Sequence, residues 1–136
     1  MDIKTLDQQV SVSEQIALGD LDGLAAAGVK VLVCNRPDGE AADQPTFAQI
    51  SAAAEKLGMT AVSIPFKPGE MTAAQRDEFA ALLKTDRKVH AFCRTGNRSS
   101  MLWAAARKAA GAAPDAILNK AKTAGFDVSA ALGGSK

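Results

Sequence analysis

The sequence predicts an α/β fold in three layers, with a mostly parallel central sheet of about four or five strands flanked by helices. Three observations support this prediction. Short apolar runs of strand type alternate with alanine-rich helical segments along the chain. Glycine, proline or a capping residue marks most of the boundaries between these strand and helix segments. Right-handed crossovers between parallel strands then leave helices on both faces of the sheet.

The first half of the chain alternates strands with helices. Gly28 and Gly58 end two helical segments, and Pro45 and Thr46 begin the second of them. The apolar residues of that second segment recur on one helical face. The predicted elements are a strand at 10–12, a helix at 21–27, a strand at 31–34, a helix from about 45 to 57 and a strand at 60–64.

The second half continues the alternation and then changes to helices alone. Thr72 caps a predicted helix, and residues 89–92 form the last predicted strand. A helix follows from about residue 99 to 110, and Pro114 opens a final helix that Gly125 ends. We therefore predict a single domain over residues 1–132, with a flexible tail at 133–136.

Composition excludes several classes of function. The net charge of +1 gives no overall field for nucleic acid or for an anionic membrane. No apolar run approaches the roughly 20 residues that span a bilayer, and the N-terminus lacks the apolar core of a signal peptide. We expect a cytoplasmic protein without metal or cofactor, because the two cysteines and one histidine do not form a zinc-site pattern.

The segment from Cys93 to Arg98 carries the strongest functional signal. It follows a predicted strand and precedes a predicted helix, at the sheet edge where ligands bind in α/β folds. Gly96 allows a tight turn that directs backbone N–H groups inward, and the helix N-terminus adds a positive potential. We predict Cys93 as a nucleophilic thiolate and an anion-binding loop made by Arg94, Thr95, Gly96, Asn97 and Ser99.

Arg98 is the predicted partner of Cys93 in catalysis. Its planar guanidinium suits a bound oxyanion, whereas Arg94 is expected to project toward the mouth of the site. Ser99 could donate a hydrogen bond to the thiolate or to a leaving group. The substrate expected from these groups is a small anion, and the sequence identifies no protein partner.

Charged residues on neighbouring loops are candidates for the rim of the site. Arg36 and Lys67 could attract an anionic substrate, or could be ordinary solvated charges. Asp38, Glu40 and Glu70 could each supply a general acid, although turn residues and solvated charges commonly have these identities. We interpret Met101 and Trp103, on the helix after the loop, as core residues.

The string CRTGNRSS resembles the active-site loop of rhodanese-type sulfurtransferases, in which a cysteine carries a persulfide. Together with VSVSEQI and LAAAGVKVLVCNRPDGE, the chain is similar to the bacterial beta-lactamase hydrolase-like protein, phosphatase-like domain family. The order of elements also resembles small dual-specificity phosphatases. This resemblance implies a protein tyrosine phosphatase-like fold.

Three differences from protein phosphatases bear on the mechanism. Those enzymes have the arginine at the sixth position after the cysteine, whereas Arg98 is at the fifth, as in many rhodanese loops. Phe92 replaces the usual histidine before the cysteine, and alternation places His90 on the opposite face of its strand from Cys93. The loop at 65–70 has no aspartate to act as general acid. Loss of that acid would slow ester cleavage by something like 10²–10⁴-fold.

These differences lead to three hypotheses in order of preference. The first is a sulfurtransferase that moves a sulfane sulfur through a Cys93 persulfide, since persulfide transfer needs no protonated leaving group. The alternative is a phosphatase that hydrolyses a phosphoester through phosphocysteine. The third is a module that binds anions or a partner without turnover.

Cys34 is a possible resolving thiol for Cys93. It ends the strand at 31–34, and the phosphatase-like strand order makes this strand a neighbour of the one that precedes Cys93. Adjacent strands lie about 4.8 Å apart, which is compatible with a disulfide. Because free cysteines are so often buried, the favoured alternative is that Cys34 is simply a core packing residue.

Overall fold

The central sheet determines the architecture. The structure is a computed structural model that describes residues 2–132, and its five strands have the order β1-β2-β5-β3-β4. The outer strand β1 (Lys4–Thr5) is antiparallel to β2, and all other neighbours are parallel. The parallel strands are β2 (Val10–Ser13), β3 (Val29–Cys34), β4 (Thr60–Ser63) and β5 (Lys88–Phe92).

The predicted α/β fold with a mostly parallel sheet is confirmed. Strand β1 was not predicted, because two residues are too few to show an alternating pattern. The flexible tail predicted at 133–136 lies outside the described residues.

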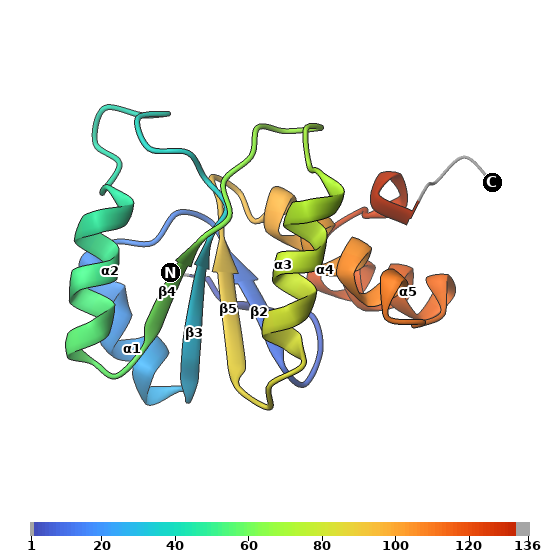
Figure 1. Cartoon of the computed structure of the whole chain (residues 1–136), viewed down its shortest axis with the longest axis horizontal. Helices are drawn as coiled ribbons and strands as arrows, with labels where there is room; N and C mark the ends of the chain where they lie inside the picture. The colour runs from blue at the N-terminus through green and yellow to red at the C-terminus, as the bar shows by residue number, and fades with distance from the viewer. Residues whose placement is uncertain (1, 133–136) are drawn as a thin grey trace.

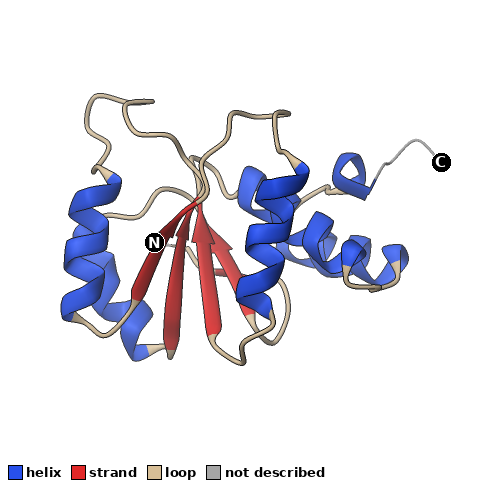
Figure 2. Cartoon of the chain, in the orientation of Figure 1, coloured by secondary structure: helices blue, strands red, loops and turns tan. Residues whose placement is uncertain are grey.

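Helices cover both faces of the sheet (Figure 1, Figure 2). One face carries α1 (Leu21–Ala26) and α2 (Phe47–Lys56). The other carries α3 (Ala73–Leu83), α4 (Asn97–Ala109) and α5 (Pro114–Ala124). Two short 3₁₀ helices, η1 (Leu18–Asp20) and η2 (Ser129–Leu132), complete the described chain.

A separate apolar cluster holds each helical layer to the sheet. On the α3–α5 side, Phe79, Leu102 and Trp103 are buried together with apolar residues of β2 and β5. On the α1–α2 side, Leu21 and Ile50 pack with residues of β3. Each fully buried large apolar side chain contributes roughly 1.5–3 kcal/mol, so the two clusters fix the positions of the loops between strands and helices.

Side-chain caps define where two helices begin. Thr72 accepts a hydrogen bond from the Gln75 amide at 3.2 Å, and the Gln75 side chain accepts one from the Thr72 amide at 2.9 Å. Thr46 makes the same reciprocal pair with Gln49 at the start of α2. Such capping boxes satisfy amides that the first helical turn leaves without partners. The predicted helix starts near Thr46 and Thr72 are therefore confirmed.

The carboxyl ends of the four parallel strands meet at one edge of the sheet, where the arrowheads in Figure 2 converge. Strand β5 passes through residues 93–96 directly into α4. The next strand, β3, is followed by a much longer connection to α2. A residue that follows β5 is therefore placed next to the N-terminus of α4.

Candidate active site

The loop after β5 depends on the backbone of Gly96. This residue is the N-cap of α4 and has a φ of 93°, in the left-handed region that favours glycine. A Cβ at this position would lie 3.0 Å from the Phe126 ring and 3.4 Å from the Ser13 carbonyl oxygen. Glycine is needed both for the turn and for the space.

The Cys93 sulfur lies inside this turn. Its Sγ accepts a hydrogen bond from the Gly96 amide at 3.1 Å, and the residue is 0% exposed. The amides of Arg94, Thr95 and Arg98 have no acceptor within residues 2–132. Together with the N-terminus of the 13-residue helix α4, these N–H groups can stabilise negative charge on the sulfur or on a bound anion.

Arg98 presents one edge of its guanidinium to the site. Its Nη1 and Nη2 donate to the two carboxylate oxygens of Glu40 at 2.9 and 2.8 Å. Nη1 also donates to the Phe66 carbonyl at 3.0 Å. A guanidinium has five N–H groups, so the Nε hydrogen and one Nη2 hydrogen are not bound to Glu40 or Phe66. These two donors point along one edge, the arrangement that binds an oxyanion in bidentate fashion. The pKa of Arg98 is raised mainly by its hydrogen bond with Glu40, and Cys93 lies close enough to contribute.

Glu40 is the residue that holds this arginine in place. Its carboxylate also accepts a hydrogen bond from Arg36 Nε at 2.9 Å, and Arg36 Nη1 donates to the Gln15 side chain at 3.1 Å. The hydrogen bonds with Arg98 and then with Arg36 lower the pKa of Glu40 from 4.5 to about 2. Glu40 is therefore ionised at neutral pH, and the structure argues against the general-acid role considered for it.

The other residues of the predicted anion-binding loop have different surroundings. Arg94, Thr95 and Asn97 are exposed at its mouth, and Thr95 Oγ1 accepts a hydrogen bond from the Asn97 amide at 3.3 Å. Ser99 is buried, and its hydroxyl donates to Asn35 Oδ1 at 2.8 Å. The hydrogen bond predicted from Ser99 to the thiolate or leaving group is therefore wrong for this conformation, because Asn35 already accepts that hydrogen.

Apart from Glu40, the proposed rim residues make no hydrogen bond through their side chains to Cys93 or Arg98 within residues 2–132. Arg36 is only 7% exposed and bound to Glu40, so it is neither a solvated charge nor a free rim cation. Asp38 accepts a hydrogen bond from the Phe47 amide at 2.9 Å at the start of α2, a turn role rather than that of an acid. Lys67 and Glu70 are exposed on the loop after β4.

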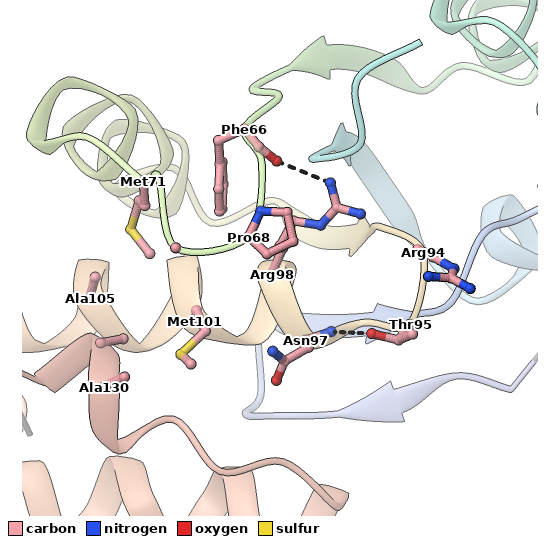
Figure 3. A pocket seen from close by; sticks show the side chains of 12 residues that line it. Phe66, Pro68, Met71, Arg94, Thr95, Asn97, Arg98, Met101, Ala105 and Ala130 are labelled. Carbon is pink, nitrogen blue, oxygen red and sulfur yellow. Dashed lines mark hydrogen bonds between the residues drawn. The ribbon is translucent and has the colours of Figure 1, made fainter. Parts of the chain in front are cut away.

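Trp103 and Met101, both on α4 and both predicted as core residues, differ in their surroundings. Trp103 is 1% exposed and donates a hydrogen bond to Asp7 at 2.7 Å, which confirms it as a core residue. Met101 instead lines a pocket of about 490 Å³ that starts at Arg94, Thr95, Asn97 and Arg98 and follows α4 (Figure 3). Met101 is half-buried and packs against the α3–α5 apolar cluster, so its prediction as a core residue holds in part. Its place on a pocket wall was not predicted, because helical periodicity does not locate the segment that forms the opposite wall.

Residues that sequence analysis missed support the loop from the next strand. The Asn35 side chain donates to the Ile64 carbonyl at 2.9 Å while accepting from Ser99, and the Asn35 amide donates to the Phe92 carbonyl. Asn35 thus ties together the ends of β3, β4 and β5. Its position directly after a strand, at the same edge as Cys93, was the available signal.

His90 has a structural position. Its Nδ1 and Nε2 each lie 2.8 Å from a serine hydroxyl, of Ser11 and Ser13 respectively, on the neighbouring strand β2. Burial, and to a smaller extent the charge of Lys88, lower the pKa of His90 from 6.5 to about 4. This agrees with its prediction as a structural residue rather than a base.

Cys34 lies on the strand next to β5, as predicted, but in register with Phe92. It is buried in the α1–α2 cluster, and its thiol donates to the Arg36 carbonyl at 3.3 Å. Burial is the main cause that raises the pKa of Cys34, and the charge of Cys93 adds to it. Both cysteines are free thiols. The resolving role of Cys34 remains a prediction.

Within residues 2–132, no helix has both the length and the apolar character needed to cross a membrane. The cytoplasmic location remains a prediction.

Known proteins similar to this chain are phosphatase-like. A curated "Beta-lactamase hydrolase-like protein" of Agrobacterium fabrum is 30% identical over 128 residues, which cover 93% of this chain and 30% of the relative. The chain thus spans under a third of that relative's length. A candidate phosphatase from Neisseria meningitidis has 35% identity and a TM-score of 0.82, covering 94% of this chain and 92% of that protein.

More distant structures share the fold alone. A cysteine-to-serine variant of the P. aeruginosa protein TpbA, solved in complex with pTyr, has 17% identity and a TM-score of 0.63, covering 87% of this chain and 70% of the other. Such neighbours confirm the predicted protein tyrosine phosphatase-like fold. The family model "Beta-lactamase hydrolase-like protein, phosphatase-like domain" matches residues 2–112, and the chain belongs to this family.

Proposed function

We propose that this domain hydrolyses phosphomonoesters through a phosphocysteine formed on Cys93. The observation that carries the proposal is the convergence of the Cys93 sulfur, the amides of residues 94–98 and the free edge of Arg98 at one helix N-terminus. Similar proteins support it, since the Neisseria relative is described as a candidate phosphatase and TpbA was solved with pTyr. The sequence favoured sulfur transfer, and these relatives support the phosphatase alternative better.

The reaction needs two displacements at phosphorus. The Cys93 thiolate forms a bond to phosphorus while the P–O ester bond breaks, and the alcohol leaves with a proton taken from water. Water then attacks the phosphocysteine, which releases inorganic phosphate and regenerates the thiolate, and the proton lost by this water neutralises the hydroxide left by the first step. The free edge of Arg98 and the loop amides bind the equatorial oxygens in both steps, where charge is greatest.

The closed loop must open for this reaction. Cys93 is fully buried and does not line the pocket, whereas Arg94, Thr95, Asn97 and Arg98 do. Gly96, the left-handed residue between them, is the position at which a backbone rotation would turn its amide away from the sulfur. We therefore propose that anion binding at the rim is followed by a turn of the loop that exposes the thiolate.

A second candidate function, transfer of a sulfane sulfur, is favoured by the surroundings of Arg98. Glu40 contacts this arginine directly, yet its pKa of about 2 prevents it from protonating a leaving alcohol. Attack of the thiolate on a sulfane donor breaks an S–S bond and releases an anion such as sulfite, which needs no proton. Arg98, at the fifth position after Cys93, also makes a shorter ring than that of protein phosphatases.

One experiment decides between the two reactions. The reduced protein is incubated with an aryl phosphate or with thiosulfate, quenched in acid, and the Cys93 peptide is analysed by mass spectrometry. A phosphate adduct with steady release of inorganic phosphate supports the proposed function, and a single added sulfur atom without phosphate release supports the second. Cys34→Ala serves as the matched control that retains the adduct, whereas Cys93→Ser loses it.

A further inference from the structure

The pocket beside the loop is much larger than the anion that the loop can bind. Its volume is about 490 Å³. A water molecule occupies about 30 Å³ in the liquid, so the pocket has room for a ligand several times the size of a tetrahedral oxyanion. Ligand sites of this size bind whole small molecules. The pocket therefore has room for the organic part of a substrate as well as for its anionic group.

The walls change in character with distance from the loop. Arg94, Thr95, Asn97 and Arg98 form the polar end, and the remaining lining is apolar apart from the backbone at Gly69. Figure 3 shows Phe66, Met71 and Met101 around the middle, Ala105 farther along α4, and Ala130 on the neighbouring η2 segment. Methionine side chains adapt to the shape of an apolar ligand. The polar end matches an anion and the rest matches a hydrocarbon.

The length of the groove follows from helix geometry. Asn97, Met101 and Ala105 are spaced four residues apart and so lie on one face of α4. The eight-residue separation of Asn97 and Ala105 corresponds to about 12 Å at 1.5 Å per residue. An extended chain advances about 1.2 Å per bond, as a fully extended backbone does, so the groove accommodates roughly eight to ten carbons.

The geometry points to a substrate in which an unbranched alkyl chain is attached to the anionic group, with the chain lying along α4 from Asn97 to Ala105. This inference deepens the proposed function, on which it rests for the identity of the anion as a phosphomonoester. A single aromatic ring would fill only the part near Met71 and Met101. The small side chains of Ala105, Ala130 and Ala131 would then have no ligand to contact.

The test measures binding separately from turnover. The Cys93→Ser chain is titrated by calorimetry with n-alkyl phosphates of increasing length, from ethyl to octyl, and with phenyl phosphate, phosphotyrosine and a phosphotyrosine peptide. Burial of a methylene contributes about 0.8 kcal/mol, which corresponds to almost fourfold. We expect affinity to rise about two- to fourfold per added methylene up to octyl phosphate.

Two tryptophan variants on the same helix show where the chain lies. Ala105→Trp fills the far end of the groove and should reduce the ratio of octyl to ethyl phosphate affinity at least tenfold. Ala109→Trp adds the same side chain one helical turn farther on, outside this pocket, and should leave the ratio unchanged. Affinity independent of chain length, tighter binding of phenyl phosphate or the peptide than of octyl phosphate, or an Ala105→Trp ratio like that of the unsubstituted chain would overturn the inference.

The proposed function can fail separately. If the wild-type chain hydrolyses none of these esters while Cys93→Ser retains the chain-length dependence, the phosphatase proposal is wrong and the alkyl groove stands. If the esters are hydrolysed, and neither their rates of hydrolysis nor their affinities depend on chain length, the alkyl groove is wrong and the phosphatase proposal stands.

Discussion

Cys34, at the end of β3, and Cys93, directly after β5, lie at the same edge of the sheet, yet their sulfurs make backbone hydrogen bonds of opposite direction. Cys34 donates its hydrogen to the Arg36 carbonyl, an interaction that requires the protonated thiol. Cys93 accepts a hydrogen bond from the Gly96 amide, an interaction that strengthens with negative charge on sulfur. The proposed nucleophile and the second cysteine are both buried, so they differ in the direction of the backbone hydrogen bond at sulfur and not in burial.

The course of the chain after each strand causes this difference. After β5 the chain turns at once into α4, so amides face the sulfur. After β3 it continues through residues 35–46 before α2 begins, and a carbonyl faces the sulfur instead. Each loop also carries a buried arginine, and Glu40 accepts hydrogen bonds from both.

The largest expected effect comes from replacing each of the two sulfur atoms by oxygen. Cys93→Ser should lower kcat for an aryl phosphate by about 10³-fold or more, because the hydroxyl is a far weaker nucleophile than a thiolate. Cys34→Ser can still donate to the Arg36 carbonyl and should keep activity within about threefold. Steady-state kinetics of both variants check this, and a comparable loss in the two would show that the environments are not functionally distinct.

The next effect concerns the two arginines. Arg98→Lys replaces the bidentate edge with a single point charge, so we expect kcat to fall roughly 10²–10³-fold. Arg36→Lys can keep one bond to Glu40 and should cost less than about tenfold. Steady-state kinetics of both variants measure these losses, and circular dichroism checks that each variant is folded. Equal losses would mean that Arg98 acts only through its ion pair with Glu40.

Acid should destabilise the fold through His90, on the strand that carries Cys93. The folded pKa of His90 is about 4 against 6.5 for the free side chain, so the unfolded state binds more protons between these values. Stability is therefore full above pH 6.5 and falls as the pH decreases toward 4. Between pH 7.5 and 5 the loss should be about 2 kcal/mol.

Urea unfolding at the two pH values measures this loss, with His90→Gln as the control that cannot titrate. Glu40, whose pKa is lowered, loses its contribution only as the pH falls from 4.5 toward 2 and adds little in this window. A His90→Gln chain with the same pH dependence as the unsubstituted one would assign the effect to other groups.

The smallest effect tests whether the two sulfurs react with each other. The raised pKa of Cys34 makes its thiolate scarce at neutral pH, so resolution of an oxidised Cys93 should be slow. After mild peroxide, non-reducing peptide mapping should find a minor Cys34–Cys93 crosslink whose fraction grows between pH 7 and 9. Sulfinic acid on Cys93 with Cys34 still a free thiol throughout that range would identify Cys34 as a packing residue.

The sequence by itself determined most of the helices and strands and the position of the candidate loop between β5 and α4. Alternating strands and helices, the caps at Thr46 and Thr72, and Gly125 at the end of α5 are local features, because each depends on neighbours within a few residues. The position of Cys93 between a strand and a helix is local in the same way. Because these features depend only on residues close in the sequence, they could be predicted without the structure.

Only the tertiary structure decided which distant residues complete the site. Glu40 and Arg98 are 58 positions apart, and Asn35 and Ser99 are 64 apart. Nothing in either local segment specifies these partners, because the order of strands in the sheet brings their loops together. Met101 became a pocket residue for the same reason: helical periodicity gives its face, whereas the loop after β4 and η2 decide what that face contacts.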